Sequence, residues 1–279
     1  MKKTINLSSI QLRKLHQVDL EILLEFDRIC RKYKIKYSLD GGTLLGAVRE
    51  KGFIPWDDDV DVVVSRKEYN KFFKVCQQDL DRSRFFLQNY RTDKNYIFGY
   101  AKLRRKETVF KRVGQDHLKQ KGGIFIDIFI RDNVPDSFPL RQVHCFVCYI
   151  LKTILNSELN KVNGRNFLIR YWNKLLNLVP SRTAFCILGK IADFSNRKET
   201  RLWRTYTFSM PHSEYGFPKK ICQEFIEIEF EKHQFMAYKR SQEYLTILYG
   251  PNFMQRPPVE EQVGHNYVNE INFGHACDR

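Results

Sequence analysis

The chain has 279 residues and a formal net charge of +15, from 47 Lys and Arg against 32 Asp and Glu. This length suits one large domain or two modest ones, and the charge favours anionic partners such as phosphorylated substrates, anionic lipid or nucleic acid. Because no long Lys/Arg block or low-complexity tail occurs, dedicated nucleic-acid binding is not indicated. No window reaches the roughly 18 apolar residues of a spanning helix. The N-terminus lacks the apolar region of a secretory signal, and seven irregularly spaced cysteines fit a reduced, cytoplasmic chain.

Capping residues and apolar spacing predict the elements of the N-terminal part. Ser8 to Gln11 reads as a capping box, and apolar residues recur after it at helical spacing as far as Ile29. Ser65 to Glu68 forms a second capping box before another apolar helical face. Strands are expected at 36–40 and 60–64, in a meander at 85–90, 96–104 and 108–112, and at 122–130. Between the first two strands we expect a glycine turn at 41–42 and a helix at 43–50 with Gly52 as its C-cap.

The rest of the sequence changes character. Residues 131–139 are turn-like and 140–200 are helical and aromatic, and residues 150–199 contain nine Lys or Arg against three acids. A short helix is expected at 241–250. The pattern indicates an α+β fold with a mixed sheet flanked by helices. We divide the chain into a catalytic core at 1–139, a basic helical insertion at 140–200 and a C-terminal part at 201–279 that completes the single catalytic domain.

Four aspartates, Asp57, Asp58, Asp59 and Asp61, crowd the start of a valine-rich strand. In an extended strand Asp59 and Asp61 share a face, and Asp57 joins them if the extension begins early. Such carboxylates either form a solvated acidic turn neutralised by Lys and Arg, or hold a cation between them. Asp127 favours the cation, because it lies inside the core-type strand IFIDIFI, where an unpaired carboxylate costs several kcal/mol. We therefore predict an all-oxygen site for Mg²⁺ or Mn²⁺ built by Asp59, Asp61 and Asp127.

Gly41, Gly42 and Thr43 lie between a predicted strand and a predicted helix. The glycines allow close approach of a ligand to the backbone, and a helix N-terminus offers free N–H groups to a phosphate. Gly42 is accordingly expected to have no room for a side chain. A glycine pair alone is explained by a tight turn. Followed shortly by a DxD motif, it is the arrangement of the nucleotidyltransferase superfold, in which the turn holds nucleotide phosphates and the carboxylates hold the metal.

Longer motifs resemble one family. GGTLLGAVREKGFIPWDDDVDVVV at 41–64 and GGIFIDIF at 122–129 closely resemble the signature of the LicD family of phosphotransferases. The segment AKLRRKETVF at 101–110 resembles the family's Lys/Arg segment, and EYLTILYGPNFMQRPPVEEQVGH at 243–265 resembles its closing motif. The sequence departs from the family pattern at Phe129-Ile130, where FP is usual, and at Phe253, where Tyr is commoner. Because 140–200 matches no family motif, we expect acceptor choice to lie there.

The resemblance implies metal-dependent transfer of a phosphorylated alcohol from a nucleotide diphosphate to a sugar hydroxyl. Bacterial members typically move phosphocholine from CDP-choline onto a surface glycan such as lipopolysaccharide, teichoic acid or capsule, and relatives in the fukutin group move ribitol phosphate from CDP-ribitol. By this resemblance Asp59, Asp61 and Asp127 are catalytic and bind the metal, and an Asp of the cluster is the candidate base. The expected donor-binding residues are Gly41, Gly42, Thr43, Arg49, Asp57, Lys102, Arg104 and His265.

Several alternatives stay open at this point. Arg49, Lys102 and Arg104 are also explained as surface charges, and His265 as a structural residue. A polyol-phosphate transferase using CDP-ribitol or CDP-glycerol fits the same motifs. A DxD glycosyltransferase does not need the glycine turn, and a basic nucleic-acid-binding module does not need three carboxylates.

Two further expectations concern the substrate and the place of the reaction. A choline-bearing donor calls for an aromatic cage, for which Tyr37, Trp56, Tyr90, Tyr96 and Tyr100 are candidates.

In the segment 166–179, Leu168, Tyr171, Leu175 and Leu178 share a helical face flanked by basic residues. This helix either lies in the interface at the inner face of the cell membrane, where a lipid-linked glycan acceptor is presented, or packs on the catalytic sheet.

Overall fold

A seven-stranded mixed sheet organises the computed structural model, which describes residues 7–208, 215–264 and 268–276. Its main path has the order β1-β2-β6-β4-β3, and β7 and β8 continue from the far part of β6. Strands β2 and β6 are parallel and the other neighbours are antiparallel. The strands are β1 (Ser38–Leu39), β2 (Asp61–Ser65), β3 (Phe85–Gln88), β4 (Ala101–Arg105), β6 (Phe125–Val134), β7 (Leu202–Arg204) and β8 (Phe217–Pro218). The mixed sheet confirms the predicted α+β class.

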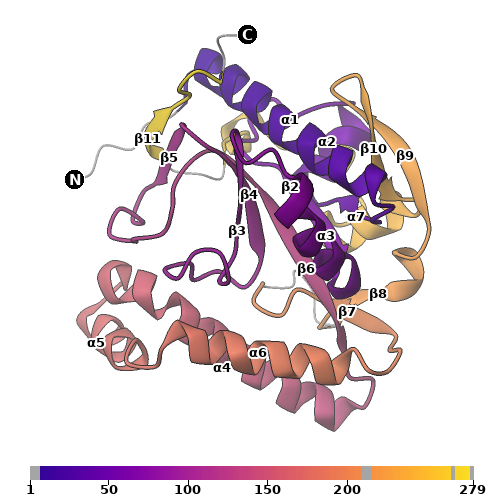
Figure 1. Cartoon of the computed structure of the whole chain (residues 1–279). Coiled ribbons are helices and arrows are strands. Elements are labelled where there is room, and N and C mark those ends of the chain that lie inside the picture. The colour runs from indigo at the N-terminus through magenta and orange to yellow at the C-terminus, as the bar shows by residue number, and fades with distance from the viewer. Residues whose placement is uncertain (1–6, 209–214, 265–267, 277–279) are drawn as a thin grey trace.

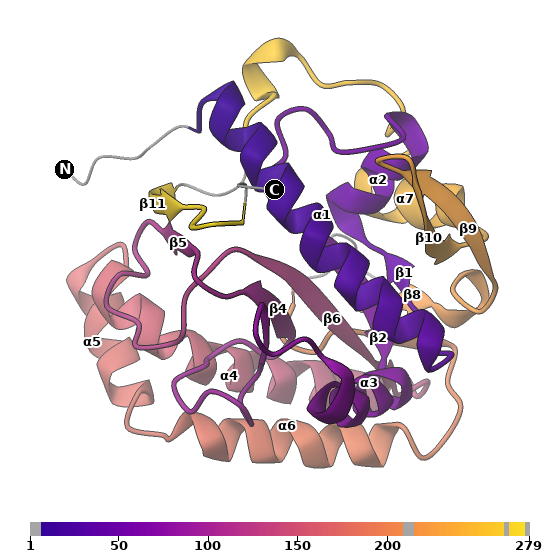
Figure 2. The same ribbon diagram turned by 45° about the horizontal axis from the view of Figure 1, so that its top comes forward.

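Helices cover the sheet on more than one side (Figures 1 and 2). In both views α4, α5 and α6 lie together, and the strands separate them from α1. The helices are α1 (Ser9–Lys32), α2 (Gly41–Arg49), α3 (Arg66–Asp79), α4 (Phe138–Asn163), α5 (Phe167–Leu176), α6 (Ser181–Ser195) and α7 (Ser241–Tyr249), with short 3₁₀ turns η1 (Lys219–Ile221) and η2 (Val259–Glu261).

The first helix forms as its sequence predicts. Ser8 and Gln11 make the reciprocal capping box, in which each side chain accepts from the other residue's backbone N–H. Leu15, Ile22 and Phe26 on its apolar stripe are buried against the sheet and α3. This packing fixes α1 across the sheet, close to the loop that precedes β2.

Two small antiparallel sheets of two strands each complete the fold: β9 (Phe225–Phe230) with β10 (His233–Tyr238), and β5 (Val109–Arg112) with β11 (Val268–Asn272). The pairing of β5 corrects the predicted meander. Because β4 already has β3 on one side and β6 on the other, it has no free edge for β5, which pairs instead with a strand from the far end of the chain.

Two local predictions were wrong. Helix α2 begins at Gly41 and ends before Glu50, and the left-handed residue after it is Lys51, with φ 56°, rather than Gly52. Strand β6 continues through 131–134, which the sequence suggested to be a turn. Its charged end is stable in the interior because Arg131 pairs with Asp40 and Asp132 pairs with Arg66.

The three helices of the segment 138–195 have a small core of their own. Helix α6 packs on β6 and α4 packs on both α5 and α6. The core residues are Cys148, Leu151, Leu155, Ala184, Phe185, Leu188, Ala192 and Tyr206. This cluster is separate from the main core around the sheet, so the segment forms a helical unit attached to β6.

Candidate active site

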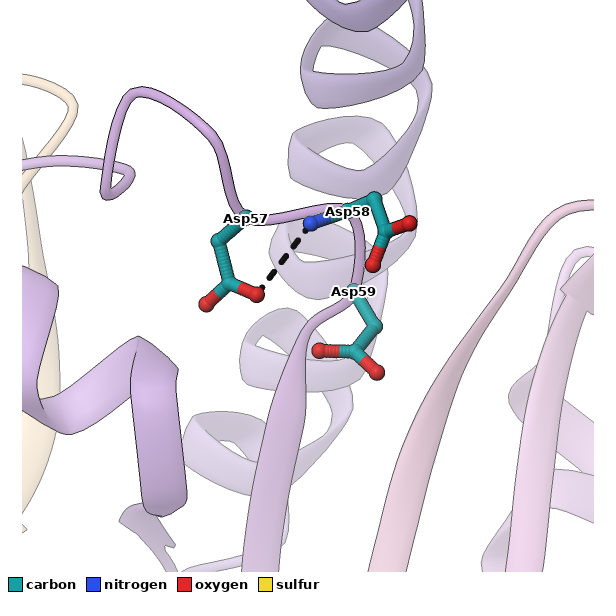
Figure 3. Close-up of side chains that lie close together, drawn as sticks. All are labelled: Asp57, Asp58 and Asp59. Atoms are coloured by element: carbon teal, nitrogen blue, oxygen red, sulfur yellow. Dashed lines mark hydrogen bonds between the residues drawn. The ribbon is translucent and has the colours of Figure 1, made fainter. Parts of the chain in front are cut away.

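Three carboxylates gather on the turn that precedes β2 (Figure 3). Asp57, Asp58 and Asp59 each offer an oxygen within 4.8 Å of the others. Asp57 and Asp58 are buried and Asp59 is half-buried. The Asp57 carboxylate accepts a hydrogen bond of 3.2 Å from the Asp58 N–H. Burial, with the charges of Asp59 and Asp58, raises the pKa of Asp57 well above its usual range, so the site favours any group that neutralises it.

The turn is held by residues far from it in sequence. The His16 ring on α1 lies 2.7 Å from the Asp57 carbonyl oxygen through Nε2 and stacks on Phe53 with ring centroids 3.9 Å apart. Asp57 N–H donates to the Ile54 carbonyl oxygen. Trp56 is half-buried against the main core, as packing of the loop requires. The carboxylates are therefore positioned by α1 and the main core.

Asp61 and Asp127 face each other across the parallel strands β2 and β6, where they are register partners. Burial and the charges of Asp59 and Asp127 raise the pKa of Asp61 well above its usual range. Asp127 is buried and forms an ion pair with Lys102 on β4. Burial lowers the pKa of Lys102 to about 7 although Asp127 opposes that shift. Asp61 and Asp127 lie outside the 4.8 Å group that Asp59 belongs to, so the three predicted ligands are neighbours along two strands rather than one closed cluster.

The start of α2 meets these carboxylates. Gly41 has φ +51°, and a Cβ on it would lie 3.0 Å from Asp61 Oδ2. A Cβ on Gly42 would overlap the Asp57 carboxylate. Gly42 therefore has no room for a side chain, as expected, and the neighbouring group that occupies the space is Asp57. The buried Thr43 hydroxyl accepts from Asp61 N–H at 2.9 Å. The glycine turn thus brings the helix N-terminus directly against the aspartates.

The side chains predicted to bind the donor phosphates differ in how far contacts within the protein already occupy them. Arg49 pairs with Glu50 and donates to the Phe253 carbonyl oxygen at 3.2 Å, which ties it to the closing motif. Arg104 is buried and donates to Gln88 and to the Gly123 carbonyl oxygen, and burial lowers its pKa to about 10. His265 lies outside the described residues.

Sequence reasoning missed two residues of the site. Asp19 on α1 is fully buried, and within the described part of the chain neither of its carboxylate oxygens has a hydrogen-bond partner. Burial, followed by the charges of Asp59, Asp58 and Asp57, raises its pKa well above the usual range. Arg112 on β5 lies 3.8 Å from Asp59 through Nη2. The signal for Asp19 was available, because it interrupts the apolar stripe of α1 between Leu15 and Ile22.

Two cavities flank the aspartates. The basic cavity, of about 130 Å³, is lined by five cations together with Phe98, Phe110 and Phe125; the cations are Lys102, Arg104, Lys111, Arg112 and Lys121. The aromatic cavity, of about 410 Å³, is lined by Asp40, Gly41 and Asp61 and by five rings, which are Phe129, Phe208, Phe217, Tyr244 and Tyr249. The site therefore offers an anion-binding side and an aromatic side with carboxylates between them.

The five predicted cage aromatics are scattered in the described structure. Tyr37 is buried and donates to Asp27, Tyr96 is buried, and Tyr90 stacks on Phe185 of α6. Tyr100 lies 5.2 Å from the Lys102 ammonium, measured to the ring centroid. None of the five lines the aromatic cavity.

Known proteins match both the site and the whole chain. A family model described as LicD/FKTN/FKRP, nucleotidyltransferase domain, matches residues 34–143, which include Asp40, Asp57 and Asp127. The chain is 31% identical over 280 residues to the lipopolysaccharide cholinephosphotransferase LicD of Haemophilus influenzae, an alignment that covers 93% of this chain and 97% of that protein. An uncharacterized protein of Rickettsia prowazekii, RP689, is 28% identical over 122 residues, covering 42% of this chain and 40% of its own.

Proposed function

Because this chain belongs to the LicD family of phosphotransferases, we propose that it transfers phosphocholine from CDP-choline to a hydroxyl of a cell-surface glycan such as lipopolysaccharide. The similarity to a lipopolysaccharide cholinephosphotransferase over almost the full length of both chains supports this choice of group and acceptor. One observation carries the proposal: the N-terminus of α2 lies directly against Asp57 and Asp61, between a basic and an aromatic cavity.

A divalent cation, Mg²⁺ or Mn²⁺, fits the aspartate site. The donors are all carboxylate oxygens, which suit hard cations. Asp19, which has no hydrogen-bond partner among the described residues, is buried near them, and a cation would favour its charged form. We keep Asp59, Asp61 and Asp127 as the proposed ligands, with Asp57 beside them. When bound, the cation neutralises the donor diphosphate as negative charge develops on the departing CMP.

The protein's own residues supply positioning and proton transfer. The glycan hydroxyl oxygen attacks the phosphorus atom that carries choline, and the bond from that phosphorus to the CMP oxygen breaks. A carboxylate of the cluster accepts the hydroxyl proton. The first turn of α2 and the Arg112 guanidinium of the basic cavity are placed to hold phosphate oxygens. Orientation of the two reactants beside these groups is the main contribution of the fold.

The aromatic cavity suits the choline end of the donor. Aromatic faces attract a quaternary ammonium, which has no N–H to donate. Asp40 and Asp61 also line the cavity, and the charge of Asp40 is compensated by Arg131 in the same wall. Against the five rings a polyol such as ribitol would lose hydrogen bonds to water, which only the few polar groups of the wall could replace. The cavity therefore favours phosphocholine over ribitol phosphate or glycerol phosphate.

The reaction is tested with purified protein, labelled CDP-choline and lipopolysaccharide that lacks phosphocholine. We expect label on the glycan and release of CMP, both abolished by EDTA and restored by Mg²⁺ or Mn²⁺. CDP-ribitol, CDP-glycerol and UDP-sugars serve as competing donors. Turnover of a UDP-sugar without turnover of any CDP-alcohol would identify a glycosyltransferase and overturn the proposal.

The choline subsite has a separate test. Tyr249→Leu should raise the KM for CDP-choline about threefold to fivefold, the size of one cation–π contact at an exposed residue, with a smaller effect on CDP-ribitol. Tyr90→Leu is the matched control, because Tyr90 is a partly exposed tyrosine that does not line the cavity. Equal effects of Tyr249→Leu on both donors would remove the choline assignment and leave the phosphotransferase assignment in place.

A further inference from the structure

The helical unit exposes an unusual amount of apolar surface around α5. Leu168 is 74% exposed, Trp172 58% and Leu178, just after the helix, 78%. Phe167, Tyr171 and Leu175 are exposed on the same side of the helix. We call these six residues the α5 face. The one residue of α5 that is buried is polar, Asn173, which faces the rest of the protein. Helix α5 is thus apolar on its outer side, the reverse of an ordinary surface helix.

Charge on the surrounding segment has a single sign. Residues 159–192 contain no Asp or Glu and six Lys or Arg, which are Lys161, Arg165, Arg170, Lys174, Arg182 and Lys190. At helical spacing Lys174 falls at one edge of the α5 face and Arg170 lies next to it, further round the helix. An apolar face bordered by cations alone is typical of helices that lie in the interface of an anionic bilayer.

We infer that the α5 face docks on an anionic lipid membrane. Tyr171 and Trp172 suit the headgroup level, where amphipathic rings concentrate, and each nearby cation adds attraction to anionic lipid. A second copy of the chain is a poorer occupant, because a two-fold contact would bring the cations of both copies together. A contiguous exposed apolar patch of this kind also needs some partner.

The helix lies on the membrane rather than through it. Among the described residues no single helix is long and apolar enough to cross a bilayer, and α5 with α6 reaches the required length only as a pair bent by 73°. Helix α6 packs on β6, the strand that carries Asp127. Docking of α5 would therefore attach the strand that carries Asp127 to the membrane through the helical unit. The inference on lipid binding does not depend on the reaction proposed above.

Liposome flotation of the full chain tests the docking. We expect binding to phosphatidylcholine vesicles with about 30% phosphatidylglycerol, weak binding to phosphatidylcholine alone, and release at about 0.5 M NaCl. Arg170→Gln with Lys174→Gln should lower partitioning about 25-fold, since each cation contributes about fivefold. Leu168→Ser with Trp172→Ser should lower it at least as much. Val259→Ser, at an equally exposed apolar residue on η2, is the control and should bind as wild type.

Two kinds of result would overturn the inference, one from the binding test and one from the oligomeric state. One is the absence of vesicle binding at low salt, or binding that survives both double variants. The other is a concentration-dependent dimer, measured by light scattering, that Leu168→Ser dissociates while vesicles leave it intact; the α5 face would then be a contact between copies. Near-wild-type circular dichroism of the variants excludes misfolding as the cause of lost binding.

Discussion

Asp127 has two contacts that matter for its replacement. It is a proposed metal ligand, and it is also the ion-pair partner of Lys102, whose side chain is 2% exposed. We expect Asp127→Ala to abolish transfer, lowering the rate by more than about 100-fold. Because the buried Lys102 would lose its partner, we also expect a loss of about 3 kcal/mol in unfolding free energy, rather than the gain that relief of repulsion alone would give. Chemical denaturation and CMP release measure the two effects. Near-wild-type activity would exclude Asp127 from the metal site.

Asp19 tests whether the buried carboxylate of α1 belongs to the cation site. Asp19→Asn keeps the shape and removes the charge, so it should weaken Mn²⁺ binding about tenfold or more, measured by calorimetry or electron paramagnetic resonance. It should also raise the unfolding free energy without metal at neutral pH, because an uncompensated buried charge is removed. The control is Asp27→Asn, a buried aspartate on the same helix that pairs with Arg31. It should cost stability and leave Mn²⁺ affinity unchanged. Unchanged affinity in Asp19→Asn would assign that residue a purely structural role.

Gly42 tests the contact between α2 and the aspartates. A side chain at this position meets the Asp57 carboxylate, so Gly42→Val should displace Asp57 and weaken CDP-choline binding about tenfold or more, with little effect on the acceptor KM. Gly189→Ala is the matched control, since a Cβ there meets no described atom within 4 Å. This substitution should stabilise α6 slightly. Calorimetry with CDP-choline decides the question. Equal nucleotide affinity in Gly42→Val would make the glycine pair a simple helix start.

At the scale of elements, the sequence predicted those helices and strands whose formation depends on contacts between residues close together in the chain. Helix α1 follows from its capping box and apolar stripe, and β2 from its valines. The sequence did not predict that β5 pairs with β11, because that choice depends on which edges of the sheet remain free. The sequence also predicted that β6 ends at Ile130, because it could not show the two buried ion pairs with distant residues that keep the charged end of this strand in the sheet. Asp19 interrupts the apolar stripe of α1, but its closeness to the aspartates before β2 depends on how α1 packs and could not be predicted.

Helix α4 carries a pH-sensitive contact in His144. Its ring is buried against Tyr206, and burial, with the nearby Arg204 opposed by Asp132, lowers its pKa from 6.5 to about 4. The unfolded chain then binds more protons between these two values, so stability should fall as pH decreases through that window, by about 3 kcal/mol in full. Urea denaturation at several pH values measures the slope. His144→Phe should flatten it, while the exposed His233→Gln should not. An unchanged slope in His144→Phe would place the sensitivity elsewhere.

For the whole molecule, composition indicated the kind of ligand to expect but said little about the architecture. The excess of positive charge indicated anionic ligands, and the basic cavity and the cationic border of the α5 face are both local forms of it. The existence of a second, smaller core under α4 and α6 was not predictable, because the apolar residues of 140–200 could equally have joined the main core. Which apolar residues stay exposed depends on how the helices pack on one another.

The stability of the whole chain should depend on divalent cations in a way that changes with pH. Asp19, Asp57 and Asp61 have pKa values raised well above 3.8, so without metal the folded state binds more protons than the unfolded state. Stability without metal should therefore fall as pH rises above about 4 towards these raised values. A cation replaces the protons, so its stabilising effect should grow with pH and reach about 3 kcal/mol at a hundredfold excess over its Kd.

Thermal denaturation with Mn²⁺ or EDTA at several pH values measures this dependence of stability on the cation. Asp57→Asn with Asp61→Asn should lose most of the effect. The control is Asp79→Asn, at a half-buried aspartate of α3 that pairs with Arg28 and Lys32, and it should keep the effect. An equal Mn²⁺ effect in the double variant would place the cation at another site.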